Sequence, residues 1–147
     1  MKTFYYTSYI KTTPKDLFTA LTTNSFIKRY WFGRQFNTDW KQGSKIEVFD
    51  NEGKIDWVGK VVTYEPYTKL AYTFRLEWKP TLKNDEPSLV TFKLEPEGKS
   101  TVKMTVLHEQ LTQGAFDEVN EGWPAILSNL KSLLESGKPL EFEVSGE

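Results

Sequence analysis

The chain of 147 residues contains no cysteine and only one histidine, His108. The lack of cysteine excludes disulfides, zinc ribbons, iron–sulfur clusters and thiol nucleophiles, and one histidine is too few for a histidine-based metal centre. Lys and Arg number 19 against 20 for Asp and Glu, so no excess charge favours nucleic acid or an anionic membrane. We therefore expect no metal or cofactor, and neither nucleic acid nor a membrane as partner.

Long apolar runs are also missing. No stretch approaches the ~20 residues that a membrane-spanning helix needs, and the N-terminus does not resemble a signal peptide. These absences predict a cytoplasmic protein. The length suits one domain, and no Pro-, Gly- or Ser-rich linker divides the chain. We expect a single domain over residues 1–147, with a loosely ordered tail over 138–147.

Aromatic side chains are the one component in excess, at 15% of the residues: ten Phe, seven Tyr and five Trp. Side chains of this size must face either a large core or a cavity. Composition therefore indicates a globular domain with an unusually aromatic interior, but it does not distinguish a filled core from a hollow one.

Periodicity predicts short helices near the N-terminus and strands after them. Residues 4–10 alternate as a strand does, and Thr13 followed by Pro14 is a typical helix start. A second short helix is expected to follow, with Asn24 as its N-cap. Alternating segments joined by short turns then predict an antiparallel meander over 44–50, 55–64, 70–78, 88–95 and 100–109.

The last segment is expected to be a long amphipathic helix over 115–136, because apolar residues recur there every three or four positions. An interior proline removes a helix hydrogen bond and costs about 3 kcal/mol. Pro124 therefore predicts a kink or a restart near Gly122.

Five motifs follow one another along nearly the whole chain: residues 10–18 with their Thr-Pro turn, the aromatic segment 26–32, the strand pair 59–66 and 70–73, the strand 101–108, and the Gly-Trp pair at 122–123. Together and in this order they resemble the START-like (SRPBCC) superfamily. The nearest subgroup is similar to homologues of the activator of heat-shock-protein-90 ATPase, of the C-terminal-domain type. The resemblance implies a helix-grip fold, in which about six antiparallel strands curve around a long C-terminal helix and two short helices follow the first strand.

A helix-grip fold implies an internal surface between the sheet and the C-terminal helix. Alternation along the strands and the helix stripe predict which side chains reach it. The candidate ligand-binding residues are Tyr6, Ser8, Trp31, Trp57, Tyr72, Phe74, Trp78, Phe92, Met104, His108, Trp123 and Leu127. The alternative is that these aromatic residues simply fill a core, since close packing is the default for protein interiors.

Three functions remain open from the sequence. The first is binding of a small hydrophobic or amphipathic molecule in the cavity, with Tyr6, Ser8, Tyr72 and His108 orienting it. The second is contact with a chaperone ATPase, which the subgroup implies; the chain has only one domain, whereas such activators carry an additional N-terminal domain. The third is a cyclase-type enzyme with His108 as acid–base. No catalytic residue is assigned, because the sequence lacks paired inward carboxylates and nucleophile motifs. The expected oligomeric state is a monomer or a weak homodimer formed through a strand edge.

Overall fold

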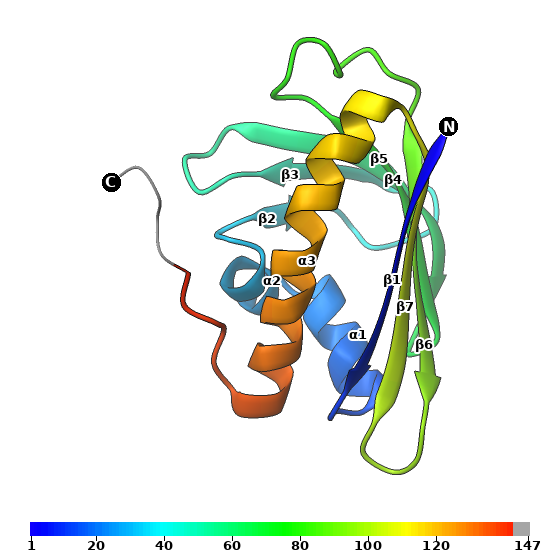
Figure 1. The fold of residues 1–147 in the computed structure, drawn as a ribbon, viewed down its shortest axis with the longest axis vertical. Coiled ribbons are helices and arrows are strands. Elements are labelled where there is room, and N and C mark those ends of the chain that lie inside the picture. The colour runs from blue at the N-terminus through cyan, green and yellow to red at the C-terminus, as the bar shows by residue number, and fades with distance from the viewer. Residues whose placement is uncertain (143–147) are drawn as a thin grey trace.

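Seven antiparallel strands form one curved sheet in the computed structural model, which describes residues 1–142 (Figure 1). Their order across the sheet is β1-β7-β6-β5-β4-β3-β2. Strands β2 to β7 follow one another as a meander, and the last strand, β7, also pairs with β1. The strands are β1 (Lys2–Ile10), β2 (Gln35–Asn37), β3 (Lys45–Phe49), β4 (Ile55–Glu65), β5 (Lys69–Leu76), β6 (Ser88–Pro96) and β7 (Val102–Leu111).

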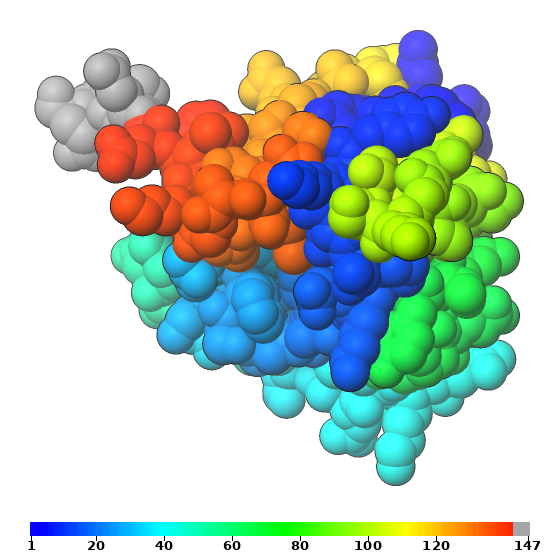
Figure 2. Space-filling view, turned by 90° about the horizontal axis from the view of Figure 1, so that it is seen from below, coloured from blue at the N-terminus to red at the C-terminus, as the bar shows by residue number. Residues whose placement is uncertain are grey.

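Three helices complete the described part of the chain: α1 (Pro14–Thr22), α2 (Asn24–Tyr30) and α3 (Gln113–Ser136). The long helix α3 crosses one face of the sheet, and Figure 2 shows α1, α2 and the last turns of α3 together closing the lower end of the molecule. This arrangement confirms the predicted α+β helix-grip fold.

Local sequence explains where α1 and α3 begin and where α3 ends. The Thr13 hydroxyl accepts the Asp16 N–H at 3.1 Å, and the Thr112 hydroxyl accepts the Ala115 N–H at 3.3 Å, so each helix starts with an N-cap. Gly137 ends α3 in the left-handed conformation, with φ of 80°, and its N–H donates to the Leu133 carbonyl.

Alternation places the core as the sequence predicts. On β7, Val102, Met104, Val106 and His108 are buried, while the residues between them are half-buried on the outer face. The apolar stripe of α3, from Val119 to Leu133, covers these inward side chains. The domain therefore has one continuous aromatic and aliphatic core between sheet and helix.

The structure differs from the sequence-based expectation in three places. The three-residue strand β2 was not predicted, because so short a segment carries no detectable alternation. Strand β5 ends at Leu76 rather than at Trp78. Helix α3 runs through Pro124 without a restart: Pro124 and Asn120 are exposed, so the Asn120 carbonyl that loses its helix partner faces water instead of the core.

The start of the C-terminal tail packs against the helices. The Leu140 N–H donates to Asn129 Oδ1, the Asn129 amide donates to the Tyr30 carbonyl at 3.2 Å, and the Arg29 guanidinium donates to the Gly137 carbonyl at 3.0 Å. These contacts reach Leu140, and positions 143–147 of the predicted loose tail lie outside the described residues.

The helices of residues 1–142 are all too short or too polar to cross a membrane.

Candidate functional site

A pocket of about 160 Å³ opens between the first half of α3 and the strands β4 and β5. Its lining combines aromatic side chains with a few charged ones. Twelve residues form it: Trp31, Arg34, Asp56, Trp57, Phe74, Leu76, Trp78, Glu118, Val119, Gly122, Trp123 and Ile126.

Buried aromatic rings form the floor of the pocket. Trp57 and Trp123 are 1% and 2% exposed, and Trp31 and Phe74 are also buried. The ring centroids of Trp31 and Trp123 lie 5.2 Å apart, and those of Trp57 and Phe74 lie 4.4 Å apart. Pairs at these separations make favourable aromatic contacts. The floor is therefore a rigid, largely apolar surface.

The floor offers little hydrogen bonding. Trp57 Nε1 is the one buried side-chain nitrogen or oxygen among residues 1–142 without a partner, and solvent does not reach it. The Trp123 N–H is already used, because it donates to His108 Nδ1 at 3.0 Å. A ligand in the pocket therefore meets ring carbon from these two indoles and not their N–H groups.

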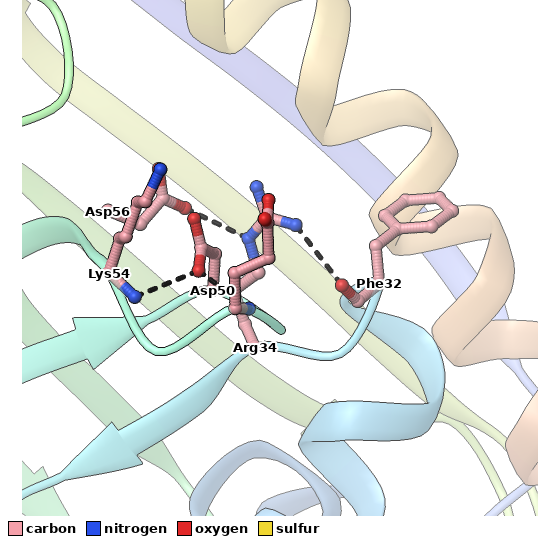
Figure 3. Close-up of polar contacts among 6 residues, drawn as sticks. Phe32, Arg34, Asp50, Lys54 and Asp56 are labelled. Atoms are coloured by element: carbon pink, nitrogen blue, oxygen red, sulfur yellow. Dashed lines mark hydrogen bonds and ion pairs between the residues drawn. The ribbon is translucent and has the colours of Figure 1, made fainter.

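Charged side chains stand at the rim, and Figure 3 shows how Arg34 lies among them. The Arg34 guanidinium donates from Nε to Asp56 Oδ2 at 3.0 Å and from Nη1 to the Phe32 carbonyl at 3.1 Å. Glu118 of α3 accepts from Lys79 Nζ at 2.6 Å. The pocket thus has an apolar floor and a polar mouth.

The turn between α2 and β2 positions both Trp31 and Arg34. Phe32 and Gly33 have positive φ, at 48° and 80°, and this left-handed turn sends Trp31 inward and Arg34 to the rim. A Cβ on Gly33 would lie 2.9 Å from the Cβ of Asn51, so glycine is required there for space as well as for conformation. Aromatic residues rarely adopt positive φ, and Phe32 therefore stores backbone strain beside the pocket.

Five of the twelve predicted site residues line this pocket: Trp31, Trp57, Phe74, Trp78 and Trp123. The expectation that Trp78 points inward is wrong, since it follows the end of β5 and is 53% exposed at the rim. The other seven predicted residues do not line it: Tyr6, Ser8, Tyr72, Phe92, Met104, His108 and Leu127. Four of these seven are packed in the core: Tyr72, Phe92, Met104 and Leu127. For this part of the sheet, the aromatic residues fill the interior and do not line a cavity.

His108 is buried in a complete chain of hydrogen bonds. Trp123 Nε1 donates to Nδ1, so the ring proton is on Nε2, which lies 2.7 Å from the Ser88 hydroxyl oxygen. That hydroxyl donates to the Phe74 carbonyl at 2.9 Å. Burial lowers the pKa of His108 to about 3. With both ring nitrogens engaged and the imidazole neutral, His108 holds the sheet and α3 together and has no free position for proton transfer.

Sequence reasoning missed the charged rim. Strand parity does not place Asp56 on the inner face of the sheet, and no motif in the sequence singles out Arg34 or Glu118. No periodic signal marks Arg34, because its place depends on the strained turn at Phe32 and Gly33. Glu118 precedes the apolar residue Val119 on α3, so helix spacing alone places it at the edge of the buried stripe. This position at the edge of the stripe is the sequence signal that could have identified Glu118 as a rim residue.

Within residues 1–142, no group of three or more His, Asp or Glu side chains is arranged to hold a metal ion.

Comparison with models of protein families shows to which family the chain belongs. Residues 11–135 match the family model described as "Activator of Hsp90 ATPase homolog 1-like protein". The chain belongs to this family. The match runs from the end of β1 to the last turn of α3, so it includes every residue that lines the pocket.

Solved structures of several proteins resemble this member of the activator of Hsp90 ATPase homolog 1-like family. A protein from Mesorhizobium loti is 25% identical with a TM-score of 0.76, covering 90% of this chain and 96% of its own. The Aha1 dimer from Colwellia psychrerythraea is 23% identical with a TM-score of 0.76, covering 94% and 99%. An HSP90 activator from Plasmodium falciparum is 20% identical with a TM-score of 0.76, covering 91% and 96%. No curated protein sequence matches the chain.

Proposed function

We propose that this protein binds a small amphipathic molecule whose apolar part, about the size of one aromatic ring, enters the pocket between α3 and strands β4 and β5. The observation that carries the proposal is the pocket itself: about 160 Å³ with four tryptophans in its lining and charged groups at its mouth. A cavity of about 150 Å³ in an unrelated protein is large enough for benzene. The hydrophobic ligand that the sequence predicts therefore has to be small, because the rest of the interior is filled.

Affinity for a probe of seven or eight heavy atoms is expected to be modest. Such molecules reach dissociation constants of about 0.1–1 mM when most of their surface is buried. Benzyl alcohol is a suitable neutral probe, because its ring fits the floor and its hydroxyl can stay at the polar mouth. Binding should raise the melting temperature as the probe concentration rises.

Trp78 provides the first test by mutation. It is half-exposed at the rim, so Trp78→Ala is expected to change stability by less than about 1 kcal/mol while weakening benzyl alcohol binding about three- to tenfold. Tyr5→Ala is the matched control, since Tyr5 is 64% exposed and lies outside the pocket lining. Equal affinities for the Trp78→Ala variant and the wild type in a calorimetric titration would contradict the proposal.

Gly122 provides a test in which stability and binding change in opposite directions. It lies inside α3 at the pocket wall, and the nearest atom to an added Cβ is Ile126 Cδ1, at 4.0 Å. Gly122→Ala is expected to stabilise the fold by about 0.5–1 kcal/mol, because glycine disfavours helices. Gly122→Leu should retain the fold and fill the pocket. Chemical denaturation and probe titration measure both effects, and a folded leucine variant that still binds benzyl alcohol normally would overturn the assigned pocket.

A second candidate function is contact with a chaperone of the Hsp90 type. It is supported by the description of the family and by the Plasmodium falciparum relative, which is an HSP90 activator. The test is the ATPase rate of purified Hsp90 with and without this protein, together with co-elution of the two. An increase in rate that the Gly122→Leu variant retains would show a surface function separate from the pocket, and an unchanged rate without co-elution would remove this candidate.

The oligomeric state and the cellular location stay predictions. A weak homodimer is supported by the Colwellia psychrerythraea relative, which is described as a dimer, and sedimentation over a range of concentrations tests it. A cytoplasmic location follows from the sequence argument alone, and fractionation of cells that express the protein tests it.

A further inference from the structure

The tryptophans of the pocket suggest the charge of its ligand. Four of the five tryptophans in the chain line the pocket, and only Trp40 does not. The faces of indole rings carry negative electrostatic potential and attract cations within about 6 Å. The rim already shows such a contact, since Lys79 Nζ lies 5.9 Å from the centre of the Trp78 ring.

Carboxylates outnumber cations around the mouth. A shallower groove adjoins the pocket and shares Trp31, Arg34 and Glu118 with it, and this groove adds Glu121. Pocket and groove are lined by three carboxylates, Asp56, Glu118 and Glu121, and by the Arg34 guanidinium, and the Lys79 ammonium pairs with Glu118 at the rim, which leaves one carboxylate in excess. Glu121 is exposed and forms no ion pair within residues 1–142.

The single guanidinium is not free to bind an anion. Arg34 is held by Asp56 and by the Phe32 carbonyl, as Figure 3 shows. A further carboxylate, Asp50, also lies near it, and the Arg34 charge contributes to lowering the pKa of Asp50, after the larger effect of the hydrogen bond from the Lys54 N–H. An anionic ligand would have to displace these contacts and approach the acidic groups of the mouth.

We propose that the ligand is a cation: a small primary or quaternary amine that carries an apolar group of about one ring. The apolar group lies among Trp31, Trp57 and Trp123, and the ammonium group lies at the mouth near Glu121, because Glu118 is already paired with Lys79. This inference rests on the proposed function, because it names the chemical class of molecule that the same pocket takes. It differs from that function in predicting the sign of the ligand's charge.

Three probes with the same ring test the inference: benzylamine, which is cationic at pH 7, neutral benzyl alcohol, and anionic benzoate. Titration calorimetry at low salt is expected to give about tenfold tighter binding for benzylamine than for benzyl alcohol, and weaker binding for benzoate than for either. The preference for benzylamine should shrink as salt is added, because the carboxylates at the mouth are solvated and are screened by ions.

Variants that remove one carboxylate charge show which residue causes the preference for benzylamine. Glu121→Gln is expected to reduce benzylamine affinity about two- to threefold and to leave benzyl alcohol affinity unchanged. Glu97→Gln is the matched control, because Glu97 is an exposed carboxylate in the β6–β7 turn and does not line the pocket. If none of the three probes binds, the proposed function fails. If benzyl alcohol or benzoate binds as tightly as benzylamine, the pocket stands and the inference about charge is overturned.

Discussion

Between pH 7 and pH 5 the wild-type protein is expected to lose about 2 kcal/mol of unfolding free energy, and a His108→Gln variant is expected to lose almost none. The cause is the buried hydrogen-bond chain in which Trp123 and Ser88 hold a neutral imidazole. Glutamine does not titrate, so the variant lacks the proton-linked part of the stability.

That stability falls as the pH is lowered follows from the pKa values of His108 in the folded and unfolded states. Burial lowers the pKa to about 3 in the folded protein, whereas the unfolded chain has the ordinary value of 6.5. Above pH 6.5 the imidazole is neutral in both states and the stabilisation is fully present. Between pH 6.5 and pH 3 the unfolded chain binds a proton that the folded protein does not, so stability falls by about 1.4 kcal/mol per pH unit.

The range from pH 7 to pH 5 suits this measurement, because the two carboxyl groups with lowered pKa values titrate below it. Asp50 and Glu135 have lowered pKa values, caused first by hydrogen bonds from the Lys54 and Lys11 N–H groups respectively, so their contribution is lost only at lower pH. Urea denaturation at several pH values gives the slope of the unfolding free energy against pH for the wild type and for the His108→Gln variant. Parallel slopes for wild type and variant would show that His108 is not the buried neutral group described here.

His108→Gln is also expected to cost about 2–4 kcal/mol at pH 7, because it disturbs a buried network that includes Trp123 and Ser88. Ser88→Ala removes the hydroxyl that lies 2.7 Å from His108 Nε2 and should cost less, about 1–3 kcal/mol, while retaining the pH dependence. The pH dependence therefore distinguishes loss of the titrating group from loss of packing.

Gly59→Ala is expected to destabilise the protein by about 3 kcal/mol or more, and to lower its melting temperature by about 10 °C. A Cβ at position 59 would lie 1.8 Å from the carbonyl oxygen of Thr73 and 2.7 Å from its carbonyl carbon. Both atoms belong to the backbone of β5, so no side-chain rotation relieves the clash. The strands β4 and β5, which hold Trp57 and Phe74, would have to separate.

Two other glycines serve as controls for this substitution. Gly122→Ala should be stabilising, as argued from its place in α3. Gly43→Ala adds a Cβ with no atom within 4 Å, but at a φ of 89°, so it should cost only about 1–2 kcal/mol of backbone strain. A melting temperature of Gly59→Ala equal to that of the wild type would contradict the close approach of β4 to β5.

The fold could be predicted from sequence because its signals are local and repeated. The Thr13-Pro14 helix start, the alternation on β7 and the apolar stripe of α3 each specify one element, and the structure contains all of them. Pro124 misled the prediction, because the cost of an interior proline depends on whether the freed carbonyl faces water. That exposure is set by the tertiary packing of α3.

The site could be predicted only in part, for a similar reason. Strand parity identifies inward residues such as Trp57, Phe74 and Tyr72, but it does not say which of them border an empty space. Tyr72 is packed in the core and Trp57 borders the pocket, although both face the same side of the sheet. The difference depends on where α3 and the Phe32–Gly33 turn leave a gap.

The central claim is that one ring of a small molecule enters the space among Trp31, Trp57 and Trp123. The most direct measurement is nuclear magnetic resonance of labelled protein with benzyl alcohol, with each tryptophan assigned by its replacement with phenylalanine. Saturable shifts and ring-to-ring contacts are expected for these three indoles, and none for Trp40, which lies outside the pocket lining. No saturable shift at these indoles, or equal shifts at all five tryptophans, would contradict this claim.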